Sequence, residues 1–226
     1  MNRNQLIIAA VAVVIIAAAA VGYYKFFPSQ TTTGAIPDAT ASTGPGYTIT
    51  ADDRTMGNAK APVVMIEYAA PTCPHCAHFD ETVFPFLKQN YIQTGKVYYV
   101  FRVYPLHPTD GAAEAMARCL PADNYFEFID LLFRNQAKWD WEYGVTDLHG
   151  ALVSMGRLAG MTPEKVDSCI ADKAMAERIN KVAMDGQTRY NITGTPTFVI
   201  NGVVHQSGEM GTPADLQSVL DPLLKK

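Results

Sequence analysis

Two cysteines stand two residues apart, directly after an uninterrupted apolar segment. Cys73 and Cys76 enclose Pro74 and His75, which gives the motif CPHC. A CxxC pair either forms a small disulfide that exchanges with other thiols or supplies half of a zinc site. The chain has neither a second CxxC nor a nearby HxxxH that would complete a zinc site. The motif therefore favours redox chemistry, and we expect no bound metal.

The residues on both sides predict the elements that position these thiols. Residues 63–69 form an apolar run that predicts a buried strand. Apolar residues then follow the motif at helical spacing: Phe79, Val83, and Phe86 or Leu87. The cysteines thus lie where a strand ends and a helix over about residues 73–89 begins. The first N–H groups of a helix lack partners, and the helix dipole adds positive potential there.

This position predicts different roles for the two thiols. Cys73 is expected to be the exposed residue at the helix N-terminus, with its thiolate favoured and its pKa lowered. Cys76 lies one turn on, faces inward, and resolves the mixed disulfide. His75 lies next to the thiolate, where we expect it to donate a hydrogen bond or a charge to sulfur. A stabilised thiolate stabilises the reduced protein, which makes the disulfide form a stronger oxidant.

A second feature lies far downstream, where Thr195 and Pro196 precede the apolar residues 197–201. Proline cannot donate to a sheet ladder and is confined to strand starts. An X-Pro bond in this setting is a candidate for the cis form. The dipeptide Asn201-Gly202 then predicts a tight hairpin turn into a returning strand over residues 203–206.

Two segments, APVVMIEYAAPTCPHCAHF and GTPTFVINGV, resemble the DsbA family of extracytoplasmic disulfide oxidoreductases in the thioredoxin superfamily. The likeness runs from about Gly57 to the C-terminus and is weak between these segments. It implies an α/β, thioredoxin-like fold with an inserted helical subdomain. It also implies that Pro196 is cis and faces the CxxC, and that Thr195 contacts the active-site sulfurs.

The same resemblance gives a role to Glu67, six residues before Cys73. Thioredoxin-like proteins often carry a buried acid at this position that relays a proton to the inner cysteine. The alternative is a strand-edge residue that faces water, because buried acids are rare unless they are paired. The lysine that usually pairs with the acid is not evident here, and Lys96 is only a loose match.

The resemblance implies an enzyme that introduces disulfide bonds into reduced exported proteins. A quinone-linked membrane partner of the DsbB type would reoxidise it, and no organic cofactor is needed. Two alternatives stay open: a thiol reductase or isomerase of the same superfamily, and a non-catalytic module that uses CPHC to hold copper or zinc or acts as a chaperone. The expected catalytic residues are Glu67, Cys73, Pro74, His75, Cys76, Thr195 and Pro196.

The N-terminal segment, residues 1–27, predicts export of the rest of the chain. Residues 6–22 are apolar and uncharged and are followed by aromatic residues, and the run reaches the lower limit of about 17 residues for a membrane-spanning helix. We therefore expect residues 6–24 to tether the chain to the bacterial inner membrane, with the remainder in the periplasm. A signal peptide cut near Ala17–Ala20, and a secreted product, is the alternative.

Residues 28–46 are rich in Thr, Ser, Ala, Gly and Pro, which predicts a flexible linker. Residues 47–226 then form the expected thioredoxin-like domain. Within it, residues from about 106 to 172 carry apolar positions at helical spacing, which predicts the helical insertion. Cys119 and Cys169 lie on apolar faces of these helices. In an exported chain we expect them to form a structural disulfide, and two buried thiols are the alternative.

The composition is ordinary for a globular protein: 48% of the 226 residues are hydrophobic, 18% are charged, and the net charge is −4. No cluster of lysines and arginines stands out along the chain. We therefore expect no nucleic-acid partner.

Overall fold

The computed structural model describes residues 42–44 and 46–225. The expected N-terminal segment over residues 1–27, and the expected linker up to residue 41, lie outside the described residues. Within the part that is described, no helix combines the length and the apolar character needed to cross a membrane.

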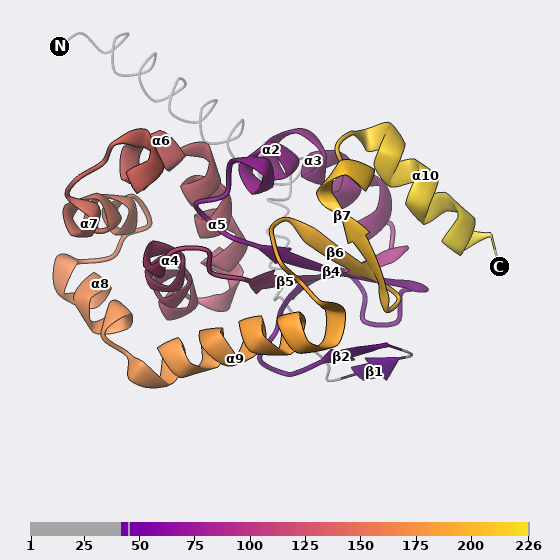
Figure 1. The fold of residues 1–226 in the computed structure, drawn as a ribbon, viewed down its shortest axis with the longest axis horizontal. Coiled ribbons are helices and arrows are strands. Elements are labelled where there is room, and N and C mark those ends of the chain that lie inside the picture. Colours follow the sequence, from indigo (N-terminus) through magenta and orange to yellow (C-terminus); the bar gives the residue numbers. More distant parts are fainter. Residues whose placement is uncertain (1–41, 45, 226) are drawn as a thin grey trace, which may run out of the picture. The chain divides into compact units, whose positions relative to one another are not determined.

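A five-stranded mixed sheet carries the fold, in the order β3-β5-β4-β6-β7 (Figure 1). The central strand β4 runs parallel to its neighbour β5, and the other neighbouring strands pair antiparallel. The strands are β3 (Arg54–Met56), β4 (Val63–Ala69), β5 (Val97–Val103), β6 (Thr197–Ile200) and β7 (Val203–Gln206).

The edge strand β3 is short and has no counterpart among the elements that the sequence predicts. Its three residues pair with β5. A strand of three residues is too short to show an alternating pattern, so only its pairing partner reveals it. The hairpin of β6 and β7 was predicted, and its turn residues Asn201 (φ 48°) and Gly202 (φ 87°) are both left-handed, as a tight hairpin turn requires.

The helix after the CPHC motif is interrupted, although the spacing predicts one helix over about residues 73–89. Helix α2 (Pro74–Thr82) ends at Val83, and α3 (Phe84–Leu87) continues into a π-helical turn, Lys88–Ile92. Pro85 explains the break, because proline has no N–H for the hydrogen bond to the preceding turn.

The predicted helical block is present between β5 and β6. Thr162 and Thr212 cap α8 and α10 by accepting hydrogen bonds from Lys165 N and Asp215 N, a role that threonine favours directly before a helix. The helices are α4 (Pro108–Cys119), α5 (Tyr125–Arg134), α6 (Gln136–Trp139), α7 (Leu148–Leu158), α8 (Pro163–Ile170), α9 (Lys173–Tyr190) and, after β7, α10 (Pro213–Leu224).

A disulfide bond joins Cys119, at the end of α4, to Cys169 in α8, across a sequence separation of 50 residues. Their Cα atoms are 6.1 Å apart, and the side chain of Cys169 is buried. The bond links α4 to α8, the first and last helices of the predicted insertion.

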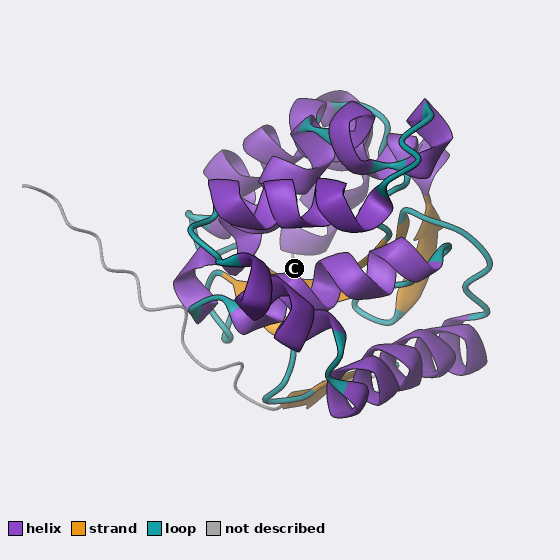
Figure 2. Cartoon of the chain, turned by 90° about the vertical axis from the view of Figure 1, so that its left-hand side faces the viewer, coloured by secondary structure: helices purple, strands orange, loops and turns teal. Residues whose placement is uncertain are grey.

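Helices cover the sheet on both sides, so that the strands run between them (Figure 2). Alternate residues of β4 point to opposite faces and serve two separate cores. Val63, Met65 and Ala69 belong to the core formed with α2, α3, α10 and the helices α4 to α8 of the insertion. Val64, Ile66 and Tyr68 pack on the other face with Ile49, Tyr190 and Ile192. Glu67 has the parity of the first set and therefore points toward α2.

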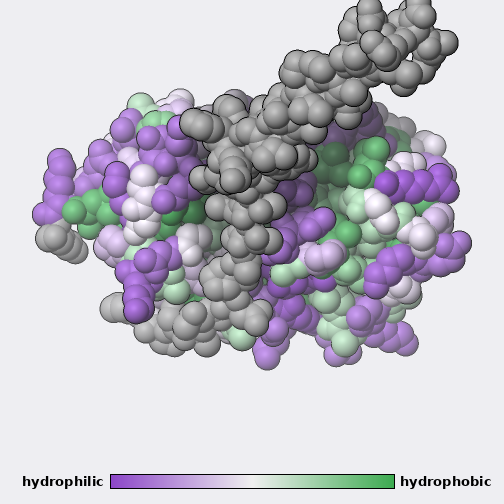
Figure 3. Space-filling view, turned by 180° about the vertical axis from the view of Figure 1, so that it is seen from behind, coloured by the Kyte–Doolittle hydropathy of each residue, from purple (hydrophilic) through white to green (hydrophobic). Residues whose placement is uncertain are grey.

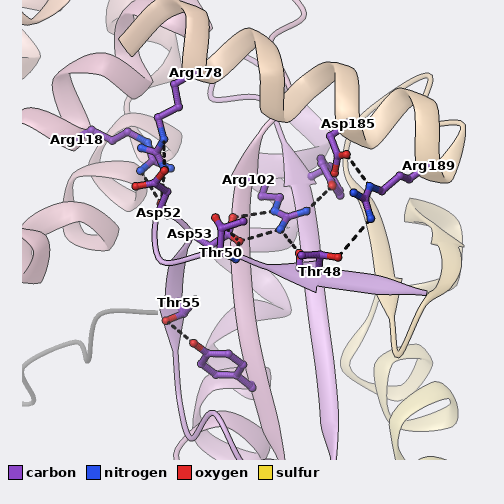
Figure 4. A network of polar contacts seen from close by, with 12 residues as sticks. Thr48, Thr50, Asp52, Asp53, Thr55, Arg102, Arg118, Arg178, Asp185 and Arg189 are labelled. Atoms are coloured by element: carbon purple, nitrogen blue, oxygen red, sulfur yellow. Dashed lines mark hydrogen bonds and ion pairs between the residues drawn. The ribbon is translucent and has the colours of Figure 1, made fainter. Parts of the chain in front are cut away.

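Strand β2 (Tyr47–Ile49) pairs with β1 (Ser42–Gly44) in a separate two-stranded sheet. A buried ion pair fastens the chain that follows it to β5 (Figure 4). Arg102 donates to both carboxylate oxygens of Asp53 at 2.8 Å, to the hydroxyl of Tyr68 at 2.8 Å and to the carbonyl of Thr48 at 2.6 Å. These bonds offset the desolvation cost of burying the guanidinium.

Seen from behind, hydrophilic and apolar residues are interspersed over the surface that is not drawn in grey (Figure 3). Such mixing is normal, since apolar atoms contribute more than half of the accessible surface of folded proteins.

Candidate active site

The two CPHC cysteines lie at the start of α2, where the chain leaves β4. Both are free thiols. Cys73 is the N-cap residue of α2, and Cys76 is fully buried in its first turn. Cys73 is 5% exposed, although its position predicts an exposed residue. The difference arises because the segment that contains Thr195 packs over the sulfur.

That segment precedes β6. The Thr195–Pro196 peptide bond is cis, and the Cys73 thiol donates a hydrogen bond to the Thr195 carbonyl at 3.3 Å. The hydroxyl of Thr195 is buried and has no hydrogen-bond partner among the described residues. The structure therefore places Thr195 against the CPHC motif from a segment more than a hundred residues away.

The electrostatic environment separates the two thiols. The hydrogen bond from the Cys76 thiol is the largest cause that lowers the pKa of Cys73, to about 6, and it outweighs the opposing effect of burial. The Thr195 side chain and the backbone N–H groups of Cys76 and His75 lower this pKa further. Burial raises the pKa of Cys76 well above its usual value. Near neutral pH the pair is thus a Cys73 thiolate beside a Cys76 thiol.

Glu67 is buried, with 2% of its surface exposed, and its partner is Tyr99 of β5. The Tyr99 hydroxyl donates to Glu67 Oε2 at 2.6 Å. Burial raises the pKa of Glu67 to about 8; the bond from Tyr99 lowers it, and the charges of Asp80 and Cys73 raise it. The loose match to Lys96 is wrong, because the Lys96 ammonium lies over the ring of Tyr91, 5.4 Å from its centroid.

Two residues of the helical insertion hold the CPHC loop, and sequence reasoning assigned neither to the site. Gln136 donates to the carbonyls of Pro71 and Cys73 at 2.8 and 3.0 Å. Asp110 accepts from the N–H and the hydroxyl of Thr72 at 2.8 and 3.1 Å. One sequence signal could have identified Gln136. It follows Ile129 and Phe133 at helical spacing, so a polar side chain falls on an otherwise apolar helix face.

Comparison with known proteins identifies the family. Residues 50–222 match the family model described as Thioredoxin. The crystal structure of Wolbachia pipientis alpha-DsbA1 superposes with a TM-score of 0.66 and 30% identity, over 76% of this chain and 90% of that one. The chain belongs to the DsbA-like members of the thioredoxin family.

Sequence relatives of this DsbA-like chain are named for disulfide chemistry. The putative protein-disulfide oxidoreductase of Rickettsia bellii is 36% identical over 70% of this chain and 60% of its own length. The probable disulfide bond formation protein D of Bacillus cereus is 29% identical over 66% of this chain and 70% of its own. The match thus spans about three fifths of the Rickettsia relative. The oxidised BdbD of Bacillus subtilis, at 22% identity and a TM-score of 0.62, supports the fold alone.

The fold predicted from the sequence is confirmed: this DsbA-like chain has a thioredoxin-like α/β fold with a helical insertion.

Pro74 is the first residue of α2, where a missing N–H costs nothing. The His75 side chain is exposed, and its backbone N–H contributes to the lowered pKa of Cys73. Among the described residues, no group of three or more His, Cys, Asp or Glu is arranged to hold a metal ion.

Proposed function

We propose that this chain is an extracytoplasmic thiol–disulfide oxidoreductase that introduces disulfide bonds into exported proteins through Cys73 and Cys76. One observation carries the proposal. A thiol whose pKa is lowered to about 6 stands beside a buried thiol whose pKa is raised. Stabilisation of one thiolate favours the reduced form, so the oxidised form tends to take electrons from substrates. The printed names of the relatives support the same chemistry.

The reaction begins with the Cys73–Cys76 disulfide. A substrate thiolate attacks Cys73 Sγ, the S–S bond breaks, and its electron pair goes to Cys76 Sγ, which takes up a proton because burial disfavours its thiolate. A second substrate thiolate then attacks the substrate sulfur of the mixed disulfide. Cys73 leaves as a thiolate, and the substrate keeps the new disulfide. The substrate loses two electrons, and the cysteine pair gains them.

The surroundings suggest a task for the other expected site residues. The cis Pro196 lies beside Thr195 and contributes no N–H, so an extended substrate segment can pair with the free backbone groups there. Pro74 begins the helix, and both Pro74 and His75 are exposed between the two cysteines. Glu67 is the acid that exchanges a proton with Cys76.

The proposal extends to location and partners. Residues 1–27 act as a signal-anchor that holds residues 47–226 in the bacterial periplasm through a linker over residues 28–46, with cleavage and secretion as the alternative. A quinone-linked membrane protein of the DsbB type reoxidises the pair, and no organic cofactor takes part.

The redox potential of the Cys73–Cys76 couple tests the direction of the reaction. The full chain is equilibrated with glutathione buffers, and the two thiols are quantified by alkylation and mass spectrometry. We expect a value near the approximately −120 mV of DsbA, whereas a value near the approximately −270 mV of thioredoxin would indicate a reductase. Tight metal binding by the reduced pair without turnover of dithiols would instead indicate a metal-binding module.

A further inference from the structure

Glu67 needs a path to water, because it is buried and yet has to regain a proton after each transfer to Cys76. Its Oε2 atom accepts the hydrogen bond of Tyr99, which is itself only 2% exposed. Tyr99 also lines a cavity of about 280 Å³ between α2, α3, β5 and α5. The tyrosine therefore stands between the buried acid and the cavity.

Asp80 lines the same cavity from α2, one turn after Cys76. Its Oδ2 atom has no accessible surface and no hydrogen-bond partner among the described residues. Burying a carboxyl oxygen without a hydrogen-bond partner costs folding free energy, and Asp80 has no part in the exchange between the sulfurs. Burial, together with a hydrogen bond to the Asp130 carboxyl, raises the pKa of Asp80 to about 7. Asp80 can therefore both hold and release a proton near neutral pH.

The charged groups around the cavity come from each element packed against it. Asp130 and Arg134 of α5 pair with each other at 2.7 Å, with about half of each side chain exposed. Glu127 of α5 and Lys88 of the π-helical turn also line the cavity. Arg134 lowers the pKa of Asp80, and Asp130 and Glu81 raise it. A proton that enters the cavity therefore meets the partly buried Asp80, whose Oδ2 atom is inaccessible, and the half-exposed Asp130.

We propose that Tyr99 and Asp80 carry protons between this cavity and Glu67, on the side of the sheet that faces the helical insertion. The inference rests on the proposed function and extends it, since it names the residues that recharge the acid serving Cys76. Both are positioning residues, because they act through Glu67 and do not touch the reacting sulfurs.

When substrate attacks Cys73, the Cys76 sulfur takes the proton of the Glu67 carboxyl group. The Tyr99 hydroxyl then gives its proton to Glu67 Oε2, and the phenol oxygen receives one from the Asp80 carboxyl, directly or through water in the cavity. Asp80 regains its proton from solvent. One proton enters from the cavity, Tyr99 is neutral before and after, and no oxidant is consumed in this step.

The test follows proton exchange at Glu67 itself. The full chain in its oxidised form is mixed with D2O, and infrared spectroscopy follows the shift of the Glu67 carboxyl band, assigned by its loss in Glu67→Gln. The variants are Tyr99→Phe, Asp80→Asn and Asp80→Ala. A positioned proton donor contributes ~10²–10⁴-fold to a transfer rate. Water in the cavity can replace part of the lost proton transfer. We therefore expect Tyr99→Phe and Asp80→Asn each to slow the exchange by about tenfold.

Two matched controls separate the relay from general effects of substitution. Tyr91→Phe removes another tyrosine hydroxyl bound to a carboxylate, at 2.7 Å from Asp221. Glu177→Gln removes an exposed acid on α9 that does not line this cavity. Both should exchange at the wild-type rate. In Asp80→Ala, formate buffer should restore the exchange, because a small acid can occupy the enlarged cavity, whereas a merely structural loss would not respond to formate.

Exchange at the wild-type rate in Tyr99→Phe and Asp80→Asn would overturn the proposal, and so would equal slowing in the controls. Slowing in Tyr99→Phe alone would remove Asp80 from the route and overturn the proposal as stated. The measurement uses no substrate. A chain that fails to oxidise dithiols therefore refutes the proposed function separately, while the exchange rates still decide the relay.

Discussion

The carbonyl of Thr195 accepts a hydrogen bond from Cys73 Sγ at 3.3 Å, although 122 positions separate the two residues. This bond needs the thiol proton and is lost when Cys73 ionises. The Thr195 hydroxyl, which is buried and has no partner among the described residues, is then the group that can donate to the thiolate. One residue thus contacts both protonation states of Cys73.

Thr195→Val tests this relationship, because it keeps the shape and removes the hydroxyl. We expect the pKa of Cys73 to rise by about 1 unit, since a hydrogen bond to a charged group contributes about 1.5 kcal/mol or more and one unit corresponds to about 1.4 kcal/mol. Ultraviolet absorbance of the thiolate as a function of pH measures the pKa. Thr82→Val removes an exposed hydroxyl from α2 and should leave it unchanged. An unaltered Cys73 pKa in Thr195→Val would show that the hydroxyl does not stabilise the thiolate.

Glu67 makes folding stability depend on pH. Its pKa is raised to about 8 in the folded chain, so between its unfolded value and pH 8 the unfolded state is ionised while the folded state keeps its proton. Stability therefore falls as pH rises through this window. Glu67→Gln removes this pH dependence. The free energy of unfolding of the variant, relative to that of wild type, should therefore rise by roughly 1 kcal/mol per pH unit from about pH 5 to 8.

Urea unfolding of the oxidised chain measures this difference, because the oxidised cysteines do not titrate. Glu127→Gln, at an exposed position, is the matched control and should follow wild type at every pH. A constant difference between Glu67→Gln and wild type from pH 5 to 8 would contradict the raised pKa.

The disulfide between Cys119 and Cys169 should stabilise the fold without setting the redox chemistry. It spans a sequence separation of 50 residues, for which the chain-entropy argument gives about 4 kcal/mol, with measured values typically about 2–4 kcal/mol. The double variant Cys119→Ala/Cys169→Ala should lose stability of this order in urea unfolding. The redox potential of the Cys73–Cys76 couple should stay the same, and a large change would show that the second pair acts on the first.

Gln136 should be needed to hold the CPHC loop. Gln136→Leu removes the hydrogen bond to the Pro71 carbonyl, while the Cys73 carbonyl keeps its bond from Ala77 N. One unsatisfied buried carbonyl costs about 1–3 kcal/mol, so we expect a loss of this size in unfolding free energy. Faster hydrogen exchange at residues 72–76 should accompany it. Exchange at the wild-type rate would mean that Asp110 alone holds the loop.

The sequence by itself determined the features that depend on neighbouring residues. The CPHC motif at a strand–helix junction, the caps at Thr162 and Thr212 and the turn at Asn201-Gly202 follow from local preferences, which act over one turn of chain. The CPHC motif at its strand–helix junction predicted redox chemistry, and the family resemblance carried by the CPHC and Thr-Pro segments predicted the fold.

Only the tertiary structure decided which distant groups meet at the site. The cover over Cys73, the Tyr99 partner of Glu67 and the Gln136 bond to the CPHC loop each join segments separated by 32 to 122 positions. The edge strand β3 likewise exists because β5 supplies its hydrogen bonds. No local pattern specifies such contacts, because they form only when strands and helices from several parts of the chain pack together.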